Sequence, residues 1–150
     1  MPKLRPNVAF ILRNRSGEIL LCERSDWPGS WQFPQGGIQK GESVDEALSR
    51  EVSEELGLPP SAYRVLTRRG PYRYLFPNGL TKRGFRGQEQ TYFLAELVDD
   101  SAVIDFGEPD SAEFRSARWI SPTDFPIDLV PAMKADVYRS VLADLLDVHL

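Results

Sequence analysis

The chain has 150 residues, the usual size of one domain, with 41% hydrophobic and 27% charged residues. Its net charge of −4 argues against a broad groove for DNA. One cysteine, Cys22, excludes an internal disulfide, and the only histidine, His149, leaves a Ser–His or Cys–His catalytic pair without an obvious base. No apolar run reaches the ~20 residues that span a membrane. We expect one cytoplasmic domain over residues 1–150, with a monomer favoured.

The first part of the chain predicts strands. Residues 8–12 and 19–22 are apolar runs, and residues 14–17, Asn-Arg-Ser-Gly, form the turn between them. Residues 31–33 predict a third, shorter strand, which runs into Pro-Gln-Gly-Gly at residues 34–37.

The next segment predicts an amphipathic helix that begins after Ser43. Ser43 is typical of an N-cap, and Glu46 stands three residues later, as in a capping box. Gly57, with two prolines after it, predicts the end of the helix. Apolar residues recur every four positions and form the buried stripe: Val44, Leu48, Val52 and Leu56.

Three glutamates crowd the last turns of this helix. At roughly 100° per residue, Glu51 and Glu55 lie on the edges of the apolar stripe and Glu54 lies further round. Glu51 and Glu55 are a like-charge pair that destabilises an isolated helix. A solvated acidic face is one interpretation. The other is a site for Mg²⁺, with Mn²⁺ as a possible substitute, because hard cations take oxygen ligands.

The second half of the chain completes a layered α/β pattern. Residues 63–67, 91–97 and 118–120 predict strands, and residues 133–148 predict a second helix. One face of this helix is apolar: Val137, Val141, Leu145 and Val148. Two helices and a mixed β-sheet favour an α/β/α sandwich.

Residues 64–86 combine basic and aromatic side chains without an acidic residue. The basic residues are Arg64, Arg68, Arg69, Arg73, Lys82, Arg83 and Arg86, and the aromatic residues are Tyr72, Tyr74, Phe76 and Phe85. Basic groups for phosphate and rings for base stacking suit the end of a nucleotide chain. The alternative is a solvated hairpin loop. Proline and glycine at positions 77, 79, 84 and 87 predict a mobile loop.

Residues 36–58, GGIQKGESVDEALSREVSEELGL, resemble the signature of the Nudix hydrolases at every defining position. The resemblance implies the Nudix fold and water attack on a nucleoside diphosphate linked to another group. It implies metal ligands from Glu51, Glu54 and Glu55, with the carbonyl of Gly36 as a main-chain ligand. Glu113 matches a distal glutamate that closes the metal site in some relatives, and the alternative is an ordinary acidic residue in a loop. Arg50 is expected to orient the ligands through an ion pair with Glu42.

The flanking segments are similar to bacterial RNA pyrophosphohydrolases and plant-type diadenosine tetraphosphate hydrolases. These segments are RPNV at 5–8, WQFPQGGI at 31–38, GQEQTYF at 87–93, Glu113-Phe114 with Trp119, and KADVY at 134–138. Tyr74, sixteen residues after Leu58, fits the same group. The resemblance implies the following substrate contacts: Arg5, Arg24, Gln32, Tyr74, Gln90 and Lys134. Relatives often have an aromatic residue where this chain has Met133, and Trp27 either substitutes for it or plugs its own loop.

Three functions remain open on the sequence. The first is an RNA pyrophosphohydrolase that converts a 5′-triphosphorylated RNA end to a monophosphate. The second is a dinucleoside polyphosphate hydrolase that cleaves diadenosine tetraphosphate to ATP and AMP. The third is a catalytically silent module that binds nucleotides or a partner, for which the loss of a signature glutamate would be the mark. None is lost.

Overall fold

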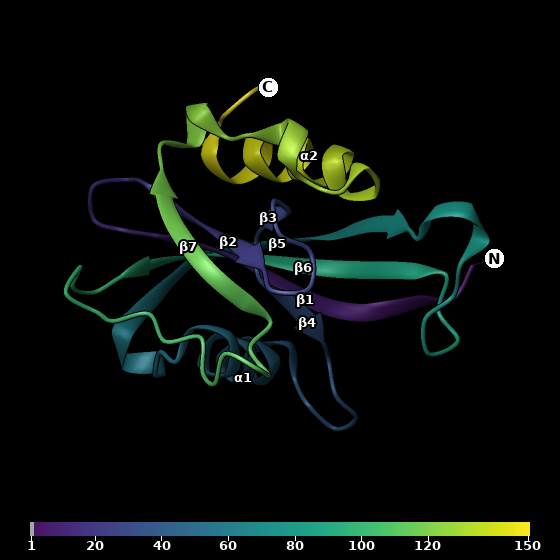
Figure 1. Ribbon diagram of the computed structural model, residues 1–150, viewed down its shortest axis with the longest axis horizontal. Helices are drawn as coiled ribbons and strands as arrows, with labels where there is room; N and C mark the ends of the chain where they lie inside the picture. Colours follow the sequence, from purple (N-terminus) through teal and green to yellow (C-terminus); the bar gives the residue numbers. More distant parts are fainter. Residues whose placement is uncertain (1) are drawn as a thin grey trace.

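The structure, a computed structural model, describes residues 2–150 and places a mixed β-sheet between two helices (Figure 1). The strands are β1 (Leu4–Arg13), β2 (Ile19–Arg24), β3 (Trp31–Gln32), β4 (Gln35–Gly37), β5 (Tyr63–Leu75), β6 (Gly87–Leu97) and β7 (Phe114–Ile120). The helices are α1 (Val44–Leu56) and α2 (Ala135–Leu146). The predicted α/β/α sandwich is confirmed. Within the described residues, no helix is both long and apolar enough to cross a bilayer.

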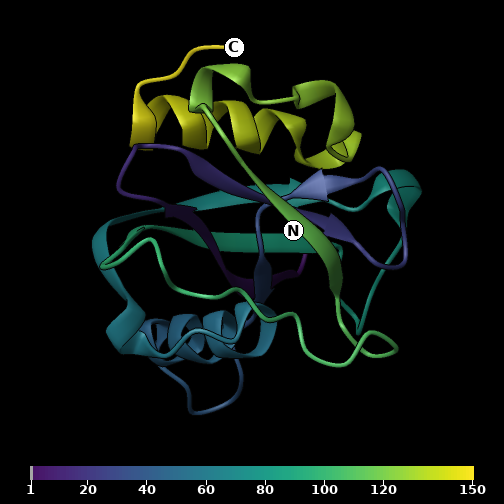
Figure 2. The ribbon, with the colours of Figure 1, turned by 60° about the vertical axis from the view of Figure 1, so that its left-hand side comes forward.

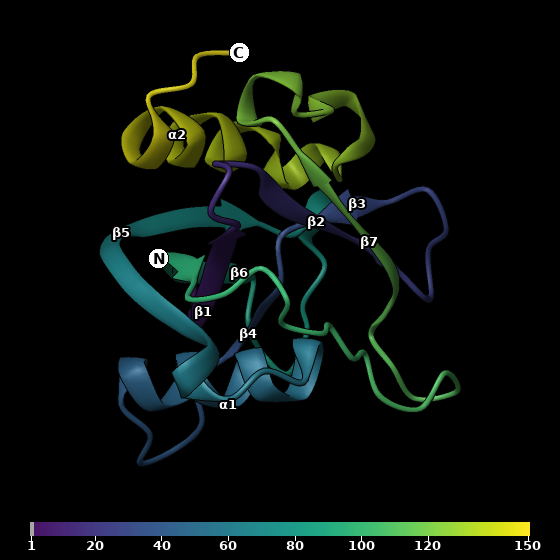
Figure 3. The ribbon, with the colours of Figure 1, turned by 90° about the vertical axis from the view of Figure 1, so that its left-hand side faces the viewer.

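The sheet is built around a central parallel pair. The strand order is β3-β2-β1-β6-β5, with β4 paired to β1 and β7 paired to β2. β1 and β6 run parallel, whereas the other pairs among the described strands are antiparallel. β5 therefore forms one edge of the sheet, as Figure 3 shows.

Side-chain alternation in β1 divides the core between the two faces of the sheet. Val8, Phe10 and Leu12 belong to the cluster that packs with α1, and Ala9 and Ile11 belong to the cluster that packs with α2. All five are at most 2% exposed. Successive strand residues point to opposite faces, so one fully apolar strand supplies both cores. Figure 2 shows the two helices on opposite sides of the sheet.

The predicted caps of α1 are present. Oγ of Ser43 accepts a hydrogen bond of 3.1 Å from the backbone N–H of Glu46, and Oε1 of Glu46 accepts one of 3.0 Å from the N–H of Ser43. Gly57 ends the helix with a φ of 67°, in the left-handed region that favours glycine. The capped helix packs its apolar stripe on the sheet and so fixes the direction of its glutamates.

Several element boundaries differ from the sequence prediction. β5 continues to Leu75 and β6 begins at Gly87, so residues 68–75 and 87–90 are strand where the sequence predicted loop, and residues 76–86 connect the two strands. The Gly70–Pro71 step is accommodated because the register shifts between Arg69 and Tyr72 on an edge strand. Residues 35–37 form β4, which the sequence did not predict. α2 begins at Ala135, after a 3-10 turn over residues 132–134, and ends at Leu146.

Candidate active site

Two glycines of β4 allow charged side chains to pack directly on the backbone. A Cβ on Gly36 would overlap the carboxylate of Glu51, and a Cβ on Gly37 would overlap the guanidinium of Arg5. The packing explains why both positions are glycine. A side chain at Gly36 would displace the Glu51 carboxylate, and one at Gly37 would displace the Arg5 guanidinium.

The three helix glutamates converge on one point. One carboxylate oxygen from each of Glu51, Glu54 and Glu55 lies within 4.8 Å of the others. Glu51 is 5% exposed, and its burial raises the pKa of its carboxyl above the usual range. Its Oε2 has no hydrogen-bond partner among residues 2–150. A buried acceptor without a donor, among like charges, is the environment that a divalent cation satisfies.

A fourth carboxylate joins the cluster from another part of the chain. Glu113 precedes β7, and its backbone carbonyl accepts a 2.9 Å hydrogen bond from the N–H of Ser25. Burial and the neighbouring Glu113 carboxylate raise the pKa of Glu55 well above its ordinary value. This is the expected response of a buried carboxyl group that lies beside other carboxylates.

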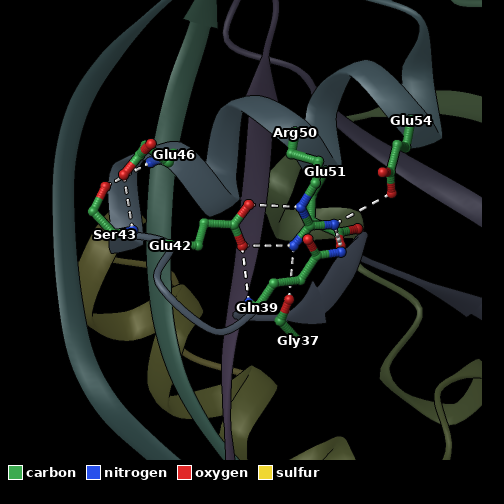
Figure 4. Close-up of polar contacts among 8 residues, drawn as sticks. All are labelled: Gly37, Gln39, Glu42, Ser43, Glu46, Arg50, Glu51 and Glu54. Carbon is green, nitrogen blue, oxygen red and sulfur yellow. Dashed lines mark hydrogen bonds and ion pairs between the residues drawn. The ribbon is translucent and has the colours of Figure 1, made fainter.

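Arg50 orients the cluster through a set of charged hydrogen bonds, drawn in Figure 4. Its Nε and Nη2 donate to the two oxygens of Glu42 at 2.7 and 2.9 Å, which confirms the predicted ion pair. Nη2 also donates to the carbonyl of Gly37 at 2.8 Å, and Nη1 donates to Oε1 of Glu51 at 2.7 Å. The Arg50 contacts, with a backbone N–H from Gln39, lower the pKa of Glu42 to about 2. Arg50 thereby ties α1, the preceding loop and β4 together.

Part of the glutamate cluster lines a cavity of about 390 Å³ that carries both acidic and basic side chains. Glu51, Glu55 and Glu113 form the acidic wall. The basic wall carries Arg5, Arg24, Lys82 and Arg83. The cavity can therefore hold a cation on one side and the phosphates of a ligand on the other.

Two of the six predicted substrate contacts, Arg5 and Arg24, line this cavity. The Arg24 guanidinium is held by Asp26, to which Nε and Nη2 each donate a hydrogen bond of 2.7 Å. The bidentate geometry fixes the guanidinium at the rim of the cavity.

The other four predicted contacts are buried and do not line the cavity. Gln32, Tyr74, Gln90 and Lys134 are at most 7% exposed. Gln35, which does line the cavity, donates to the hydroxyl of Tyr74 at 3.1 Å and accepts from Nε2 of Gln90 at 2.8 Å. Lys134 donates to Gln32 at 2.7 Å and does not face solvent. Tyr74 and Gln90 thus hold Gln35, a residue of the cavity wall, in place.

Sequence reasoning missed three polar residues of the cavity, Asn7, Gln35 and Gln88. Strand alternation could have indicated two of them. Asn7 stands two residues after Arg5 on β1, and Gln88 is the direct partner of Arg5 on β6. Trp27 is 66% exposed and does not plug its loop, whereas Met133 packs against the core on the α2 side.

A family model described as NUDIX domain matches residues 3–145. The chain belongs to the Nudix family. Nudix hydrolases need a divalent metal ion, and the glutamate cluster of α1 supplies the oxygen ligands that such an ion takes.

Relatives of known function are similar over nearly the whole chain. The RNA pyrophosphohydrolase of Cellvibrio japonicus is 41% identical and is aligned over 97% of this chain and 88% of its own length. That of Hahella chejuensis is 40% identical over 93% of this chain and 89% of its own length.

Solved structures share the fold at lower identity. The dihydroneopterin triphosphate pyrophosphohydrolase of E. coli has a TM-score of 0.73 at 15% identity, covering 97% of this chain and 98% of its own. An Ap4A hydrolase binary complex from C. elegans has a TM-score of 0.68 at 20% identity, covering 96% and 99%. At these identities the likeness concerns the Nudix fold alone.

Proposed function

We propose that this Nudix hydrolase converts 5′-triphosphorylated RNA ends to 5′-monophosphates, releasing pyrophosphate or two successive phosphates. The observation that carries the proposal is a cavity lined both by four basic side chains and by the carboxylates of Glu51, Glu55 and Glu113. The 40–41% identity to RNA pyrophosphohydrolases supports RNA as the substrate.

The proposed metal ligands are the carboxylates of Glu51, Glu54, Glu55 and Glu113, with the carbonyl of Gly36. All are oxygen donors, and the unpartnered Oε2 of Glu51 fits a hard cation. We assign Mg²⁺ to the site, with Mn²⁺ as a substitute. Such an ion supplies positive charge against phosphate oxygens and lowers the pKa of water.

The chain's own side chains would position the phosphates and handle the proton. Arg5 and Arg24 bind phosphate oxygens from the basic wall. Water attacks phosphorus, the bridging P–O bond breaks, and a carboxylate of the cluster takes the proton. Arg50 acts indirectly, because it donates a hydrogen bond to Glu51 but does not itself line the cavity. Tyr74 and Gln90 would act on substrate through Gln35, to which both are hydrogen-bonded. Lys134 lies 5.9 Å from the centroid of the Tyr74 ring and is hydrogen-bonded to Gln32, so these two residues would act one contact further back.

Dinucleoside polyphosphates present the same chemistry, a nucleotide followed by a chain of phosphates. The deciding experiment offers the purified protein equal concentrations of a short 5′-triphosphate RNA and diadenosine tetraphosphate with Mg²⁺, and follows products by chromatography. We expect a preference of tenfold or more in kcat/KM for RNA, equivalent to about 1.4 kcal/mol of transition-state stabilisation. The opposite ratio would make the chain a nucleotide hydrolase that cleaves diadenosine tetraphosphate to ATP and AMP. No turnover of either substrate would contradict both assignments.

A further inference from the structure

One amide side chain of the cavity stands apart from the hydrogen bonds that hold its neighbours. Gln90 donates to Gln35 at 2.8 Å and to Asn7 at 2.9 Å, so these amides fix one another. Gln88 also lines the cavity, yet its Oε1 has no hydrogen-bond partner within residues 2–150. Only 8% of Gln88 is exposed, so water reaches little of it. A buried carbonyl oxygen without a donor is unfavourable by itself and indicates that a ligand supplies the donor.

The sheet places Gln88 beside the arginine that we assign to phosphate. Gln88 is the cross-strand partner of Arg5 on β1 and of Tyr74 on β5, and β6 lies between those two strands (Figure 1). Paired residues on neighbouring strands are about 5 Å apart and point to the same face of the sheet. A ligand that Arg5 holds by its phosphates therefore has its next atoms beside Gln88.

Arg5 does not supply the missing donor to Gln88. Its guanidinium packs over Gly37, at the position that a Cβ would take. Gly37 belongs to β4, which pairs with the edge of β1 that faces away from β6. The guanidinium is thus turned away from Gln88, and the two side chains can contact different groups of one ligand.

The chemistry of the missing donor narrows the choice of ligand group. Phosphate oxygens accept hydrogen bonds, so ionised phosphates do not satisfy a carbonyl oxygen. A ribose hydroxyl can donate, and the ribose of the first nucleotide is joined directly to the 5′-phosphates. In an RNA chain the 3′-oxygen of that ribose is esterified, which leaves the 2′-hydroxyl as its donor. The 2′-hydroxyl is also the group by which a protein distinguishes RNA from DNA.

We propose that Oε1 of Gln88 accepts a hydrogen bond from the 2′-hydroxyl of the first nucleotide, so that Gln88 selects a ribonucleotide 5′ end over a deoxyribonucleotide one. The inference rests on the proposed function and adds the contact by which the site recognises the sugar. Gln88 determines specificity and takes no part in breaking the P–O bond. A substrate without the hydroxyl leaves a buried acceptor unpaired, which is how a polar site rejects an analogue of similar shape.

The test compares a short 5′-triphosphate RNA with the same oligonucleotide that carries a 2′-deoxyribose at its first position. We expect kcat/KM of wild type to fall about tenfold on the deoxy substrate, as the loss of one hydrogen bond gives. Gln88→Met keeps an unbranched side chain but removes the amide, and it should hydrolyse both substrates with the same, reduced kcat/KM. A 2′-deoxyribose at the second position should leave the wild-type kcat/KM unchanged.

Glu89→Met is the matched control variant. Glu89 follows Gln88 on β6, points to the other face of the sheet and does not line the cavity, so this variant should keep the wild-type preference. Thermal unfolding without substrate adds a readout besides activity. Gln88→Met should be at least as stable as wild type, because an apolar group replaces an unpaired buried oxygen. A clear fall in its melting temperature would show that the amide is bonded within the fold, against the proposal.

Two kinetic results would also overturn the proposal. Equal kcat/KM of wild type on the ribose and deoxyribose substrates would leave Oε1 to an ordered water. A preference that persists undiminished in Gln88→Met would assign the sugar to another residue of the cavity. Failure of the proposed function is a different result, because wild type would then cleave diadenosine tetraphosphate but no 5′-triphosphate RNA.

Discussion

Lys134 donates a hydrogen bond of 2.7 Å to Oε1 of Gln32 while only 3% of the lysine is exposed. Burial lowers the pKa of Lys134 to about 7, and the like charge of Arg24 adds to this effect. An unfolded lysine titrates near ~10.4. Between these values the unfolded state binds more protons than the folded state, so Lys134 makes the protein more stable as pH rises from about 7 to about 10.

Lys134→Met should therefore reduce the dependence of stability on pH. In that window we expect its free energy of unfolding to rise less steeply than that of wild type, by up to about 1.4 kcal/mol per pH unit. Denaturant unfolding at several pH values measures the slope. Lys40→Met is the control, because Lys40 is exposed and should leave the slope unchanged. Identical slopes in wild type and Lys134→Met would refute the buried-charge account.

Glu54→Gln should remove most turnover and leave the fold intact. The Glu54 side chain is 55% exposed, and its ion pair with Arg50 is a long one at 3.3 Å. Stability should stay within about 0.5 kcal/mol of wild type. Because Glu54 is a proposed metal ligand, the substitution should lower kcat or metal affinity about a hundredfold. Calorimetric titration with Mg²⁺ and Mn²⁺ checks the affinity, with Glu108→Gln as the exposed acidic control. Near-normal turnover at saturating Mg²⁺ would contradict the assignment.

Gly36→Ala should damage the site more than the fold. The added Cβ would overlap the Glu51 carboxylate, which must then leave its position on β4. We expect weaker metal binding and lower kcat. Gly17→Ala is the comparison, because Gly17 has a φ of 88° with no atom within 4 Å of the added Cβ. That variant should lose about 1 kcal/mol of stability with unchanged kinetics. Equal kinetic losses in both variants would remove the special role of Gly36.

Glu23 should contribute to stability in acid. Its hydrogen bonds with Arg115, Gly29 and Ser116 lower the pKa of Glu23 to about 2. A depressed carboxyl pKa stabilises the fold above the unfolded value of about 4.3, and this contribution is lost as pH falls toward 2. Glu23→Gln should flatten that part of the stability curve, as measured by thermal unfolding between pH 2 and 6. Glu108→Gln is the control, because Glu108 lies outside this network, and its stability should depend on pH as that of wild type does.

Tyr74 should affect binding more than chemistry. The sequence suggests Tyr74→Ala, which should raise KM more than it lowers kcat if the ring holds the nucleotide. At 7% exposure, however, removal of the ring would also cost about 3–5 kcal/mol of core packing. Tyr74→Phe is the sharper variant, because it removes only the hydroxyl that holds Gln35. A fall in kcat with unchanged KM would place Tyr74 in the chemical step.

Local sequence signals were sufficient for α1 and its glutamate cluster. The caps, the apolar stripe and the glutamates all lie within residues 43–57, so helical geometry alone brings them together. The Arg50–Glu42 pair followed from the same segment. No local sequence signal of comparable strength predicts β4, because it has only three residues and pairs with β1, which is distant in the sequence.

The buried pair of Gln32 and Lys134 could not be predicted from local sequence signals. Gln32 and Lys134 are 102 residues apart, and composition gives no sign that a lysine at the start of a helix is buried. The length of β5 was missed for another reason. Its arginines and Gly70-Pro71 are unfavourable inside a sheet but are tolerated on an edge strand, whose position depends on the whole topology.

The edge position of β5 has a consequence for how copies of this protein behave toward one another. A long edge strand offers free backbone groups on which a second chain can add a strand and begin to aggregate. Arg64, Arg68, Arg69 and Arg73 lie along β5, and none of them lines the cavity of the candidate active site. Arg68 and Arg73 form ion pairs with Asp45 and Glu89, which leaves the charges of Arg64 and Arg69 to repel a second edge of the same kind. We therefore expect these arginines to disfavour the addition of a strand from another copy.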